Sequence, residues 1–502
     1  MIGIFLLAGK AFARAGGGDS FGGGGDSSGG GGGGGGSYGG SEGGGDFSSG
    51  GGEYGGGDAL IELLFWLVFE HPLVGVPVIV VVVVGYLYLQ SQRIVVDRQV
   101  YRIEHPVRPP PTSQGPELQL LVRRDPGFSE VLFLDFARLV YTRAQEERGG
   151  DRLHVLEAVL SEAALRALRV RKAATVDKVI VGSARLCAVR VDVVYAELDV
   201  AFVANLTEDG VHRYVEERWT FRREAETRSP GPAGVRELRC PRCGSALQVR
   251  VDGSCVSCNA PLTNAALLWQ VKEIVVDRTR LVEGVELTLG GGVEVGTALP
   301  TVLAPDLTVS LRTLGARHPE FDEGQFRRRV GETFLAVQSA WSALRPEDVR
   351  ALETDAIYTS HRYWMERYRA GGLRNGSADV AVQSVELVRV QMDAYVTAIT
   401  VRIQASMLDW TEDRTGAVVG GSRTQTRRFS EYWTFVRSAG ASLAARPDLQ
   451  KCPSCGAPLD KLGETGVCGH CDATITTGDY DWVLAAIDQD EVYGARNRSV
   501  PG

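Results

Sequence analysis

Two segments of the chain show the hydrophobic spacing of a helix that buries one face. Phe128, Leu132 and Phe136 follow one another at steps of four residues, and Leu139 extends the series by a step of three. The second segment repeats this spacing with Phe326, Val330, Phe334, Val337 and Trp341. Similar phrases precede the two segments, Asp125-Pro126-Gly127-Phe128 and His318-Pro319-Glu320-Phe321. The pattern predicts two related amphipathic helices, each of which opens a domain.

Stretches of alternating hydrophobic and polar residues follow each predicted helix. Leu198, Val200 and Phe202 alternate with acidic residues in the first stretch. A period of two with one polar face is typical of antiparallel strands that are exposed on one side. The second stretch alternates in the same way at Ile399, Val401 and Ile403, and both stretches end in the sequence word E-x-W-T-F, at 217–221 and 431–435. The two halves therefore look like copies of one unit.

The order of helix, short helices, long strands, paired cysteines and apolar tail occurs twice. A helix on a curved antiparallel sheet belongs to the α+β class, so the repeat predicts two tandem domains of this class. We place the domains at 125–235 and 318–440, and the cysteine-rich segments at 236–275 and 448–490. The connection at 276–317 is apolar around its glycines, which suggests a hairpin rather than a free linker.

A long run without charged residues precedes these domains. Residues 73–89 read LVGVPVIVVVVVGYLYL, and seventeen helical residues extend about 26 Å, close to the ~30 Å hydrocarbon core of a bilayer. A buried strand is the alternative, but strands of this length with an internal proline are rare. The sequence therefore predicts a membrane segment at 59–89 with one span at 73–89, followed by a juxtamembrane linker at 90–124.

The first 58 residues contain two further signals. Residues 1–15 pass from an apolar stretch to Ala13-Arg14-Ala15, an A-x-A-like cleavage site, which favours a signal peptide over an uncleaved apolar tail. Residues 16–58 are almost entirely glycine with serine, acidic and aromatic residues. Glycine offers no side chain to bury, so this glycine-rich segment is predicted to be a disordered coil.

Charge gives the expected orientation of the span. The chain has no lysine or arginine between Arg14 and Arg93, whereas four arginines follow the span within residues 93–108. The positive-inside rule then predicts a single-pass protein of a bacterial inner (cytoplasmic) membrane, with residues 90–502 in the cytoplasm and the glycine-rich segment outside. The same arginines are suited to contact anionic lipid headgroups. The formal charge of −8 argues against a nucleic-acid partner, because such proteins present basic surfaces.

Eight of the nine cysteines form four C-x-x-C pairs, which predict two zinc ribbons. Two such turns bring four thiolates to one ion in a tetrahedron, and eleven or twelve residues separate the two turns of each set. Four thiolates leave no open coordination position, so both zinc ions are expected to be structural. Redox-active pairs are the alternative, which the repeated four-cysteine set disfavours. The expected ligands are Cys240, Cys243, Cys255 and Cys258 in the first ribbon, and Cys452, Cys455, Cys468 and Cys471 in the second.

The sequence also predicts the roles of two glycines beside these ligands and of the remaining cysteine. Gly244 and Gly456 directly follow the first C-x-x-C of each set, where a tight turn favours a residue without a Cβ atom. Cys187 stands apart from the pairs near the start of a predicted strand, and it is expected to be a small buried apolar residue.

Taken together, several features resemble one known family. The span, the glycine-rich segment, the helix ending in Gln338-Ser339-Ala340-Trp341 and the strand word Trp433-Thr434-Phe435 are similar to those of the Tim-44-like domain family. These proteins are bacterial relatives of the membrane tether of the mitochondrial import motor. The resemblance is greatest at residues 318–438 and fainter at 125–223.

The resemblance implies a fold and a class of function. The fold would be a cone similar to nuclear transport factor 2, in which helices pack on a curved sheet around an apolar cavity. The function would be scaffolding at a membrane. The mitochondrial protein has one such domain and an N-terminal chaperone-binding region, and neither feature matches here. The zinc ribbons resemble those of bacterial members instead.

These features favour a membrane-anchored scaffold or tether that is not an enzyme and that binds a protein segment or a lipid through its cytoplasmic domains. The alternative is a membrane-anchored small-ligand binder or an enzyme that uses the cone cavity. Asp393 and Tyr395, two residues apart on one strand, are its candidate residues, but Asp192 and Tyr195 do not repeat that spacing. A third alternative is an envelope protein that mainly displays its glycine-rich segment. The expected partners are the bilayer and an unidentified protein.

Overall fold

The computed structural model describes most of the chain from residue 116 onward. The described residues are 116–150, 152–171, 173–229, 254, 257–259, 269–282, 292–293, 295–441, 451–459, 462–490 and 493. The predicted signal peptide, glycine-rich segment and membrane span lie outside these residues, as do Cys240, Cys243 and Cys255 of the first predicted ribbon. Among the described helices, none combines the length and the apolar character that crossing a membrane requires.

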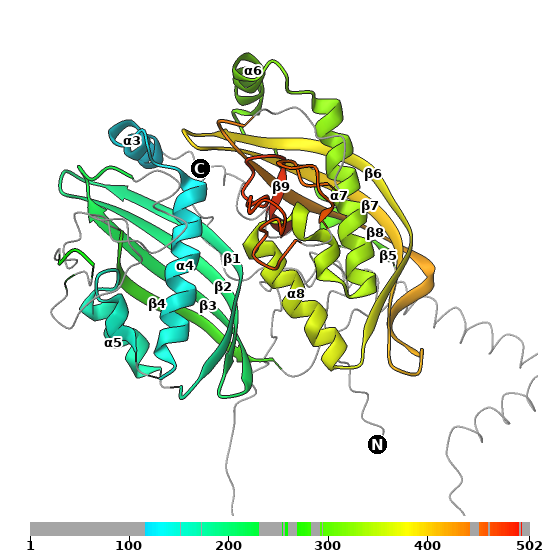
Figure 1. Cartoon of the computed structure of the whole chain (residues 1–502), viewed down its shortest axis with the longest axis horizontal. Coiled ribbons are helices and arrows are strands. Elements are labelled where there is room, and N and C mark those ends of the chain that lie inside the picture. Colours follow the sequence, from blue (N-terminus) through cyan, green and yellow to red (C-terminus); the bar gives the residue numbers. More distant parts are fainter. Residues whose placement is uncertain are drawn as a thin grey trace, which may run out of the picture. The chain divides into compact units, whose positions relative to one another are not determined.

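The first repeat, residues 116–282, is a mixed α+β unit. Its four strands form an antiparallel sheet in the order β1-β2-β3-β4, so each strand pairs with the strand that follows it along the chain. Figure 1 shows α4 lying across one face of this sheet. The elements are α3 (Pro116–Arg124), α4 (Glu130–Arg148), η1 (Leu153–Leu156), α5 (Glu162–Val170), β1 (Val176–Val191), β2 (Tyr195–Glu208), β3 (Val211–Glu224) and β4 (Gln270–Leu281).

The second repeat, residues 292–490, has the same plan with one added strand. Three long strands pair in the order β6-β7-β8, and the other edge of β8 is shared by the short parallel strand β5 and the antiparallel strand β9. The elements are β5 (Gly292–Val293), η3 (Val295–Ala298), α6 (Leu307–Arg317), α7 (Glu323–Ala343), η4 (Pro346–Leu352), α8 (Asp355–Ala370), β6 (Arg374–Met392), β7 (Val396–Glu412), β8 (Val418–Ser438) and β9 (Val483–Gln489).

The helix and strand patterns of the sequence have the expected structural roles. The predicted helices correspond to α4 and α7, although Phe128 lies just before α4 rather than in it. Each helix begins with a side-chain cap: the N–H of Leu132 donates to the Ser129 hydroxyl, and the N–H of Gln325 donates to the Asp322 carboxylate. The alternating residues of β2 and β7 are buried on the face that meets these helices: Leu198, Val200, Phe202, Ile399, Val401 and Ile403. Each hydrophobic core therefore lies between one helix layer and one sheet.

The fourth strand of each sheet follows the cysteine-rich segment. The predicted ribbons include the apolar tails of these segments, whereas in the structure the tails form β4 and β9. Trp219 of β3 pairs with Ile274, and Trp433 of β8 pairs with Ile487. Both pairings also shift register at the same place, immediately after the threonine that follows the tryptophan. Each cysteine-rich segment is thus an insertion between the third and fourth strands of a sheet.

An aromatic cluster fixes the fourth strand to the opening helix in both repeats. The ring of Phe133 lies 5.1 Å from that of Trp269 and 5.4 Å from that of Phe221. In the second repeat, the ring of Phe326 lies 4.9 Å from that of Trp482 and 5.9 Å from that of Phe435. These edge-to-face and tilted contacts add to the burial of the rings. The repeated cluster supports the predicted duplication.

The sequence motif E-x-W has a structural explanation in both repeats. Residues two apart on a strand point to the same face, so the glutamate and the tryptophan are neighbours. The indole Nε1–H of Trp219 donates to Glu217 at 2.8 Å, and that of Trp433 donates to Glu431 at 2.9 Å. Both glutamates are buried. A buried carboxylate requires hydrogen-bond donors, and the paired tryptophan supplies one each time.

A buried ion pair anchors the start of the first repeat and yields a testable prediction. Arg223 donates to the Asp125 carboxylate at 2.6 Å, and both side chains are buried. Burial raises the pKa of Asp125, but hydrogen bonds from Ser229 and Arg223 outweigh it, so the pKa lies below its usual range. Because the folded-state pKa is lowered, the pair stabilises the fold fully above pH of about 4, and this stabilisation is lost as the pH falls further.

Asp125→Asn is therefore expected to cost about 3–5 kcal/mol of unfolding free energy at pH 7, because it leaves the Arg223 cation buried without its counter-charge. Urea unfolding at pH 7 and at pH 3 measures this effect, and the difference between variant and parent should shrink at the lower pH. Asp135→Asn, on the exposed face of α4, is the matched control and should change the free energy by less than about 0.5 kcal/mol. Equal effects of the two substitutions would contradict the assignment.

Candidate metal centre

Four cysteines of the second cysteine-rich segment lie together. The Sγ atoms of Cys452, Cys455, Cys468 and Cys471 are all within 4.8 Å of one another. Cys452 Sγ is 3.8 Å from Cys471 Sγ, and Cys455 Sγ is 3.9 Å from Cys468 Sγ. Zinc–sulfur bonds of about 2.3 Å place the corners of a tetrahedron about 3.8 Å apart. The arrangement thus fits one tetrahedral ion, and four sulfur ligands suit a structural zinc ion.

Two equivalent backbone turns position these thiols. In each turn, the residue that follows the second cysteine donates its N–H to the carbonyl of the first cysteine. The N–H of the first cysteine donates to the carbonyl of the residue two positions after the second cysteine. The bonds are Gly456 N–H to Cys452 O at 2.8 Å, Cys452 N–H to Ala457 O at 2.7 Å, Asp472 N–H to Cys468 O at 3.0 Å and Cys468 N–H to Ala473 O at 2.9 Å. The sequence therefore folds locally into two matching knuckles.

Each knuckle requires a left-handed residue after its second cysteine. Gly456 has φ of +75° and Asp472 has φ of +57°. The expectation for Gly456 is confirmed, whereas the left-handed conformation of Asp472 was not predicted. Asparagine and aspartate are the non-glycine residues that adopt this conformation most readily. An Asn, Asp or Gly directly after C-x-x-C was therefore the signal available in the sequence.

The first cysteine-rich segment shows the same signature where it is described. Asn259 directly follows Cys258 and has φ of +56°, as Asp472 does after Cys471. The other three predicted ligands of this ribbon lie outside the described residues. The local geometry at Cys258 thus matches the second knuckle of the described site.

Burial and hydrogen bonding make Cys452 the more acidic of two neighbouring thiols at the described site. Cys452 and Cys468 are buried with Ile475, whereas Cys455 is exposed. Burial raises the pKa of Cys452, but the backbone N–H groups of Cys455 and Ser454 and the neighbouring thiols outweigh it and lower the pKa to about 7. At Cys455 the N–H of Ala457 lowers the pKa, but burial and the neighbouring thiols outweigh it and raise the pKa to about 12. The thiolate is the form that binds metal.

The second ribbon (residues 451–478) is held against the helices of the second repeat. Arg350 of η4 is buried and donates through Nε to the carbonyl of Glu464 at 2.7 Å and through Nη1 to the carbonyl of Glu353 at 2.9 Å. Arg362 of α8 forms an ion pair with the Glu464 carboxylate. At the end of the ribbon, Ser438 N–H donates to Gly478 O at 3.0 Å. None of these contacts is predictable from the sequence, because isolated arginines carry no pattern.

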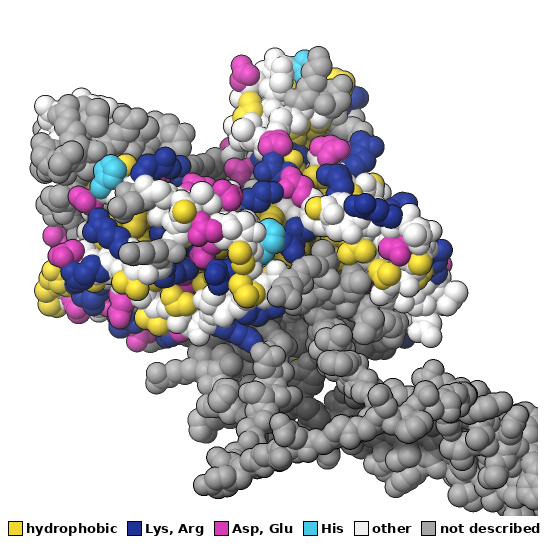
Figure 2. Space-filling model, turned by 90° about the horizontal axis from the view of Figure 1, so that it is seen from below, with side chains coloured by type: hydrophobic (Ala, Val, Ile, Leu, Met, Phe, Trp, Pro, Cys, Tyr) yellow, Lys and Arg dark blue, Asp and Glu magenta, His cyan; other side chains and the backbone are white. Residues whose placement is uncertain are grey.

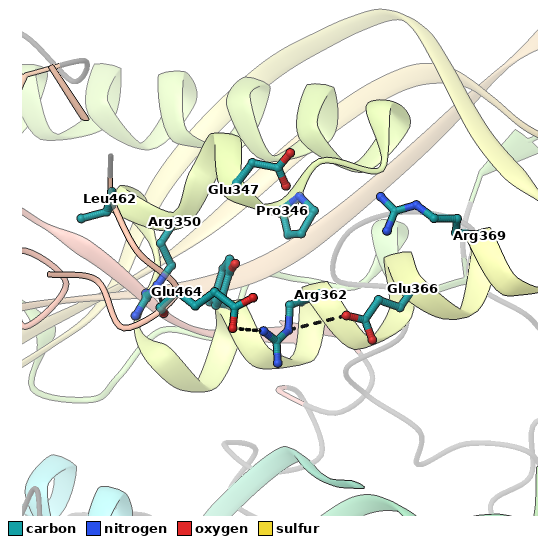
Figure 3. A pocket seen from close by; sticks show the side chains of 9 residues that line it. Pro346, Glu347, Arg350, Arg362, Glu366, Arg369, Leu462 and Glu464 are labelled. Atoms are coloured by element: carbon teal, nitrogen blue, oxygen red, sulfur yellow. Dashed lines mark hydrogen bonds and ion pairs between the residues drawn. The ribbon is translucent and has the colours of Figure 1, made fainter. Parts of the chain in front are cut away.

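A polar pocket of about 250 Å³ lies where α8, η4 and this ribbon meet. Figure 3 shows Arg362 on the pocket wall between Glu464 and Glu366, with ion pairs to both. Arg350 and Glu347 also line it. Arginine and glutamate side chains are equal in number among its lining residues, so the pocket offers no uniform charge for a charged ligand.

The loop between the two knuckles yields a second testable prediction. Gly466 has φ of +69°, and a Cβ atom there would lie 2.5 Å from the hydroxyl of Thr476 and 2.8 Å from the Arg350 guanidinium. Gly466→Ala is therefore expected to weaken zinc binding about 10–100-fold, because it displaces Thr476 and Arg350 and so shifts the loop between the two knuckles. Competition with a chromophoric chelator measures the affinity. Gly463→Ala is the control, since its nearest non-adjacent neighbour is a hydroxyl at 3.7 Å. Equal affinities for the two variants would contradict this explanation.

The residues considered for catalysis close hairpin turns. The Asp393 carboxylate accepts from the N–H groups of Tyr395 and Val396, each at 2.8 Å. The Asp192 carboxylate accepts from Val194 and Tyr195 in the same way. Equivalent turns in the two repeats thus explain both aspartates. Cys187 is half-buried near the end of β1 rather than near the start of a strand, and burial raises the pKa of its thiol.

Comparison with known proteins identifies part of the chain. Residues 307–446 match the family model of the Tim44-like domain. No curated protein matches the chain. The matched segment begins at α6 and includes α7, α8 and β6–β8, which carry the helix and strand features on which the resemblance was based. Residues 307–446 are therefore a Tim44-like domain.

Proposed function

We propose that the chain is a membrane-anchored scaffold without enzymatic activity, which binds a protein segment or a lipid through two cone-like domains. The match of residues 307–446 to the Tim44-like domain carries this proposal, because such a domain indicates a scaffold or binding role. The first repeat has the same strand order and the same aromatic cluster, so we extend the cone-like fold to it.

The membrane part of the proposal rests on the N-terminal sequence. Residues 73–89 form the span, the signal peptide and the glycine-rich segment lead to the outer side, and residues 90–502 are cytoplasmic in a bacterial inner membrane. Two structural zinc ions complete the proposal. The described four-cysteine cluster supports one of them, and the conformation of Asn259 after Cys258 supports the other.

Two observations favour a scaffold over a ligand binder or enzyme that uses an internal cavity, and over contact with nucleic acid. Large side chains fill the space between α7 and the second sheet, and Phe334, Trp433 and Val401 are all buried there. On the face shown in Figure 2, basic and acidic side chains are interspersed over the described residues. Proteins that bind a phosphate backbone present basic surfaces instead. A protein segment or lipid is thus the better candidate partner than nucleic acid.

The first experiment tests the anchoring. The full chain is expressed with a C-terminal epitope, and its membranes are washed with alkaline carbonate. Protease is then added to intact and to opened spheroplasts. We expect the epitope to stay with the membranes and to be degraded only after opening. Release of the chain by carbonate, or degradation in intact spheroplasts, would overturn the anchoring or the orientation, respectively.

The second experiment tests the scaffold role. The full chain is extracted with mild detergent, purified, and analysed for bound lipid and protein beside the Cys468→Ser variant. We expect a defined partner or lipid that the parent retains and the variant loses, because the variant disturbs the sheet of the Tim44-like domain. A parent chain that retains nothing under mild extraction would contradict the proposal.

A further inference from the structure

The turn between β1 and β2 exposes three successive apolar side chains. Val193 is 83% exposed, Val194 is 53% exposed and Tyr195 is 36% exposed. Single exposed valines are ordinary on protein surfaces, whereas three neighbours at one turn form a local apolar patch. We call residues 193–195 the hairpin tip.

Hydrogen bonds hold the hairpin tip in one conformation. The Asp192 carboxylate accepts from the N–H groups of Val194 at 2.6 Å and Tyr195 at 2.7 Å. The N–H of Asp192 donates to the carbonyl of Tyr195 at 2.9 Å. The backbone hydrogen bonds from Tyr195 and Val194 lower the pKa of Asp192, so the carboxylate stays ionised at neutral pH. The two valines therefore stand on a fixed two-residue loop.

The equivalent turn of the second repeat shows that the turn itself does not require valine. Asp393 closes that turn with the same two hydrogen bonds, and its loop residues are Ala394 and Tyr395. Tight turns favour Gly, Asn, Asp, Ser and Pro over β-branched residues. Turn formation thus does not explain the valines at both loop positions of the first repeat. Their exposed apolar side chains instead suggest that the turn contacts an apolar surface.

The path of the chain indicates which apolar surface the hairpin tip contacts. The linker that follows the proposed span leads directly into α3, and the last residue of α3, Arg124, donates to the carbonyl of Asp192 at 2.6 Å. Residues 90–115 separate the span from α3, and these 26 residues reach at most about 90 Å when extended. The hairpin tip is therefore tethered within reach of the bilayer, which is present at a high effective concentration.

The charged groups around the tip suit the boundary between water and lipid. Arg123 and Arg124 lie on α3, and the guanidinium of Arg222 lies 4.6 Å from the ring centre of Tyr195. Asp192 and Glu224, which is opposite Tyr195 in the strand pairing, offset part of this charge. Tyrosine and arginine favour the headgroup level, with apolar groups below them. Apolar contact rather than net charge is thus the basis of recognition.

We infer that the hairpin tip docks into the lipid surface of the membrane that anchors the chain, with Val193 and Val194 below the headgroups and Tyr195 at their level. This inference rests on the proposed anchoring. It assigns the membrane contact to the first repeat, outside the segment matched by the Tim44-like family.

Quenching of an added tryptophan by brominated lipid tests the contact. The full-length Val193→Trp variant is reconstituted into vesicles of phosphatidylethanolamine and phosphatidylglycerol with brominated acyl chains, and its emission is compared with that of the parent. The added tryptophan is expected to lose more than about half of its emission, because a side chain 5–10 Å below the headgroups lies among the brominated segments. The vesicles contain no other protein, so quenching reports lipid.

Val170→Trp is the matched control, because Val170 is 81% exposed at the end of α5 and carries the same change of side chain. Its added emission should not be quenched. Equal quenching of the two variants, or none at either position, would overturn the inference. A flotation assay tests the anchoring separately: if the anchoring fails, the chain will not float with the vesicles. Vesicles added to that soluble chain would still quench the Val193→Trp emission if the tip binds lipid.

Discussion

Cys468→Ser is expected to remove one zinc ion per chain and to loosen the sheet of the Tim44-like domain, not only the ribbon. The ribbon is inserted between β8 and β9, so a zinc ion bound to its four cysteines would hold β9 in place beside Trp433. Binding of zinc to four thiolates stabilises small ribbons by about 10–16 kcal/mol. Loss of a buried ligand should therefore cost more than about 4 kcal/mol and lower the melting temperature by roughly 10 °C.

Hydrogen exchange read by mass spectrometry locates this effect. Peptides of β8 and β9 should lose protection in Cys468→Ser, while peptides of β1–β3 keep theirs. Cys187→Ser is the matched control, since Cys187 lies in β1 away from the four-cysteine cluster. It should retain every zinc ion and its melting temperature. Protection lost in the ribbon alone, with β8 and β9 unchanged, would show that the ribbon does not hold the fourth strand.

Trp433→Ala should be the most damaging single substitution in the core of the second sheet. The indole is buried, its ring lies 5.3 Å from that of Phe334, and it donates to the buried Glu431. Truncation creates a cavity that costs about 3–5 kcal/mol, and removal of the donor from a buried carboxylate adds about 1–3 kcal/mol. Chemical unfolding followed by circular dichroism measures the loss.

Two matched variants make the result specific. Trp219→Ala in the first repeat should cost a similar amount, because Trp219 is equally buried and donates to Glu217 in the same way. Trp410→Ala should cost much less, since Trp410 is only half-buried and donates to Glu412 near the end of the sheet. If Trp410→Ala proved as destabilising as Trp433→Ala, the E-x-W pair would not be a special feature of the core.

The sequence predicted those elements whose pattern is local. The steps of four and three residues in α7 and the alternation in β7 follow from the geometry of single elements, and both are confirmed. The four-cysteine cluster was predictable because ligand spacing is itself local. The predictions at residues 1–115 depend on similar local patterns, and they remain predictions because they lie outside the described residues.

Features that depend on partners distant in sequence were not predictable in this way. The apolar tail at Trp482 reads as part of a ribbon until its pairing with β8, some fifty residues earlier, is known. Arg350 holds the ribbon through the backbone carbonyl of Glu464, and no spacing rule connects these two residues. The left-handed Asp472 could have been recognised, because it follows a C-x-x-C turn as Gly456 does.

The central claim is that each half of the chain carries one zinc ribbon inserted into its sheet. Metal analysis of the full chain, purified without added zinc, tests it most directly together with a count of thiols released by chelation and unfolding. We predict two zinc ions per chain and eight released thiols in addition to Cys187. One zinc ion would contradict the ribbon of the first repeat, and no zinc with disulfides in place of thiols would contradict both ribbons and the cytoplasmic placement.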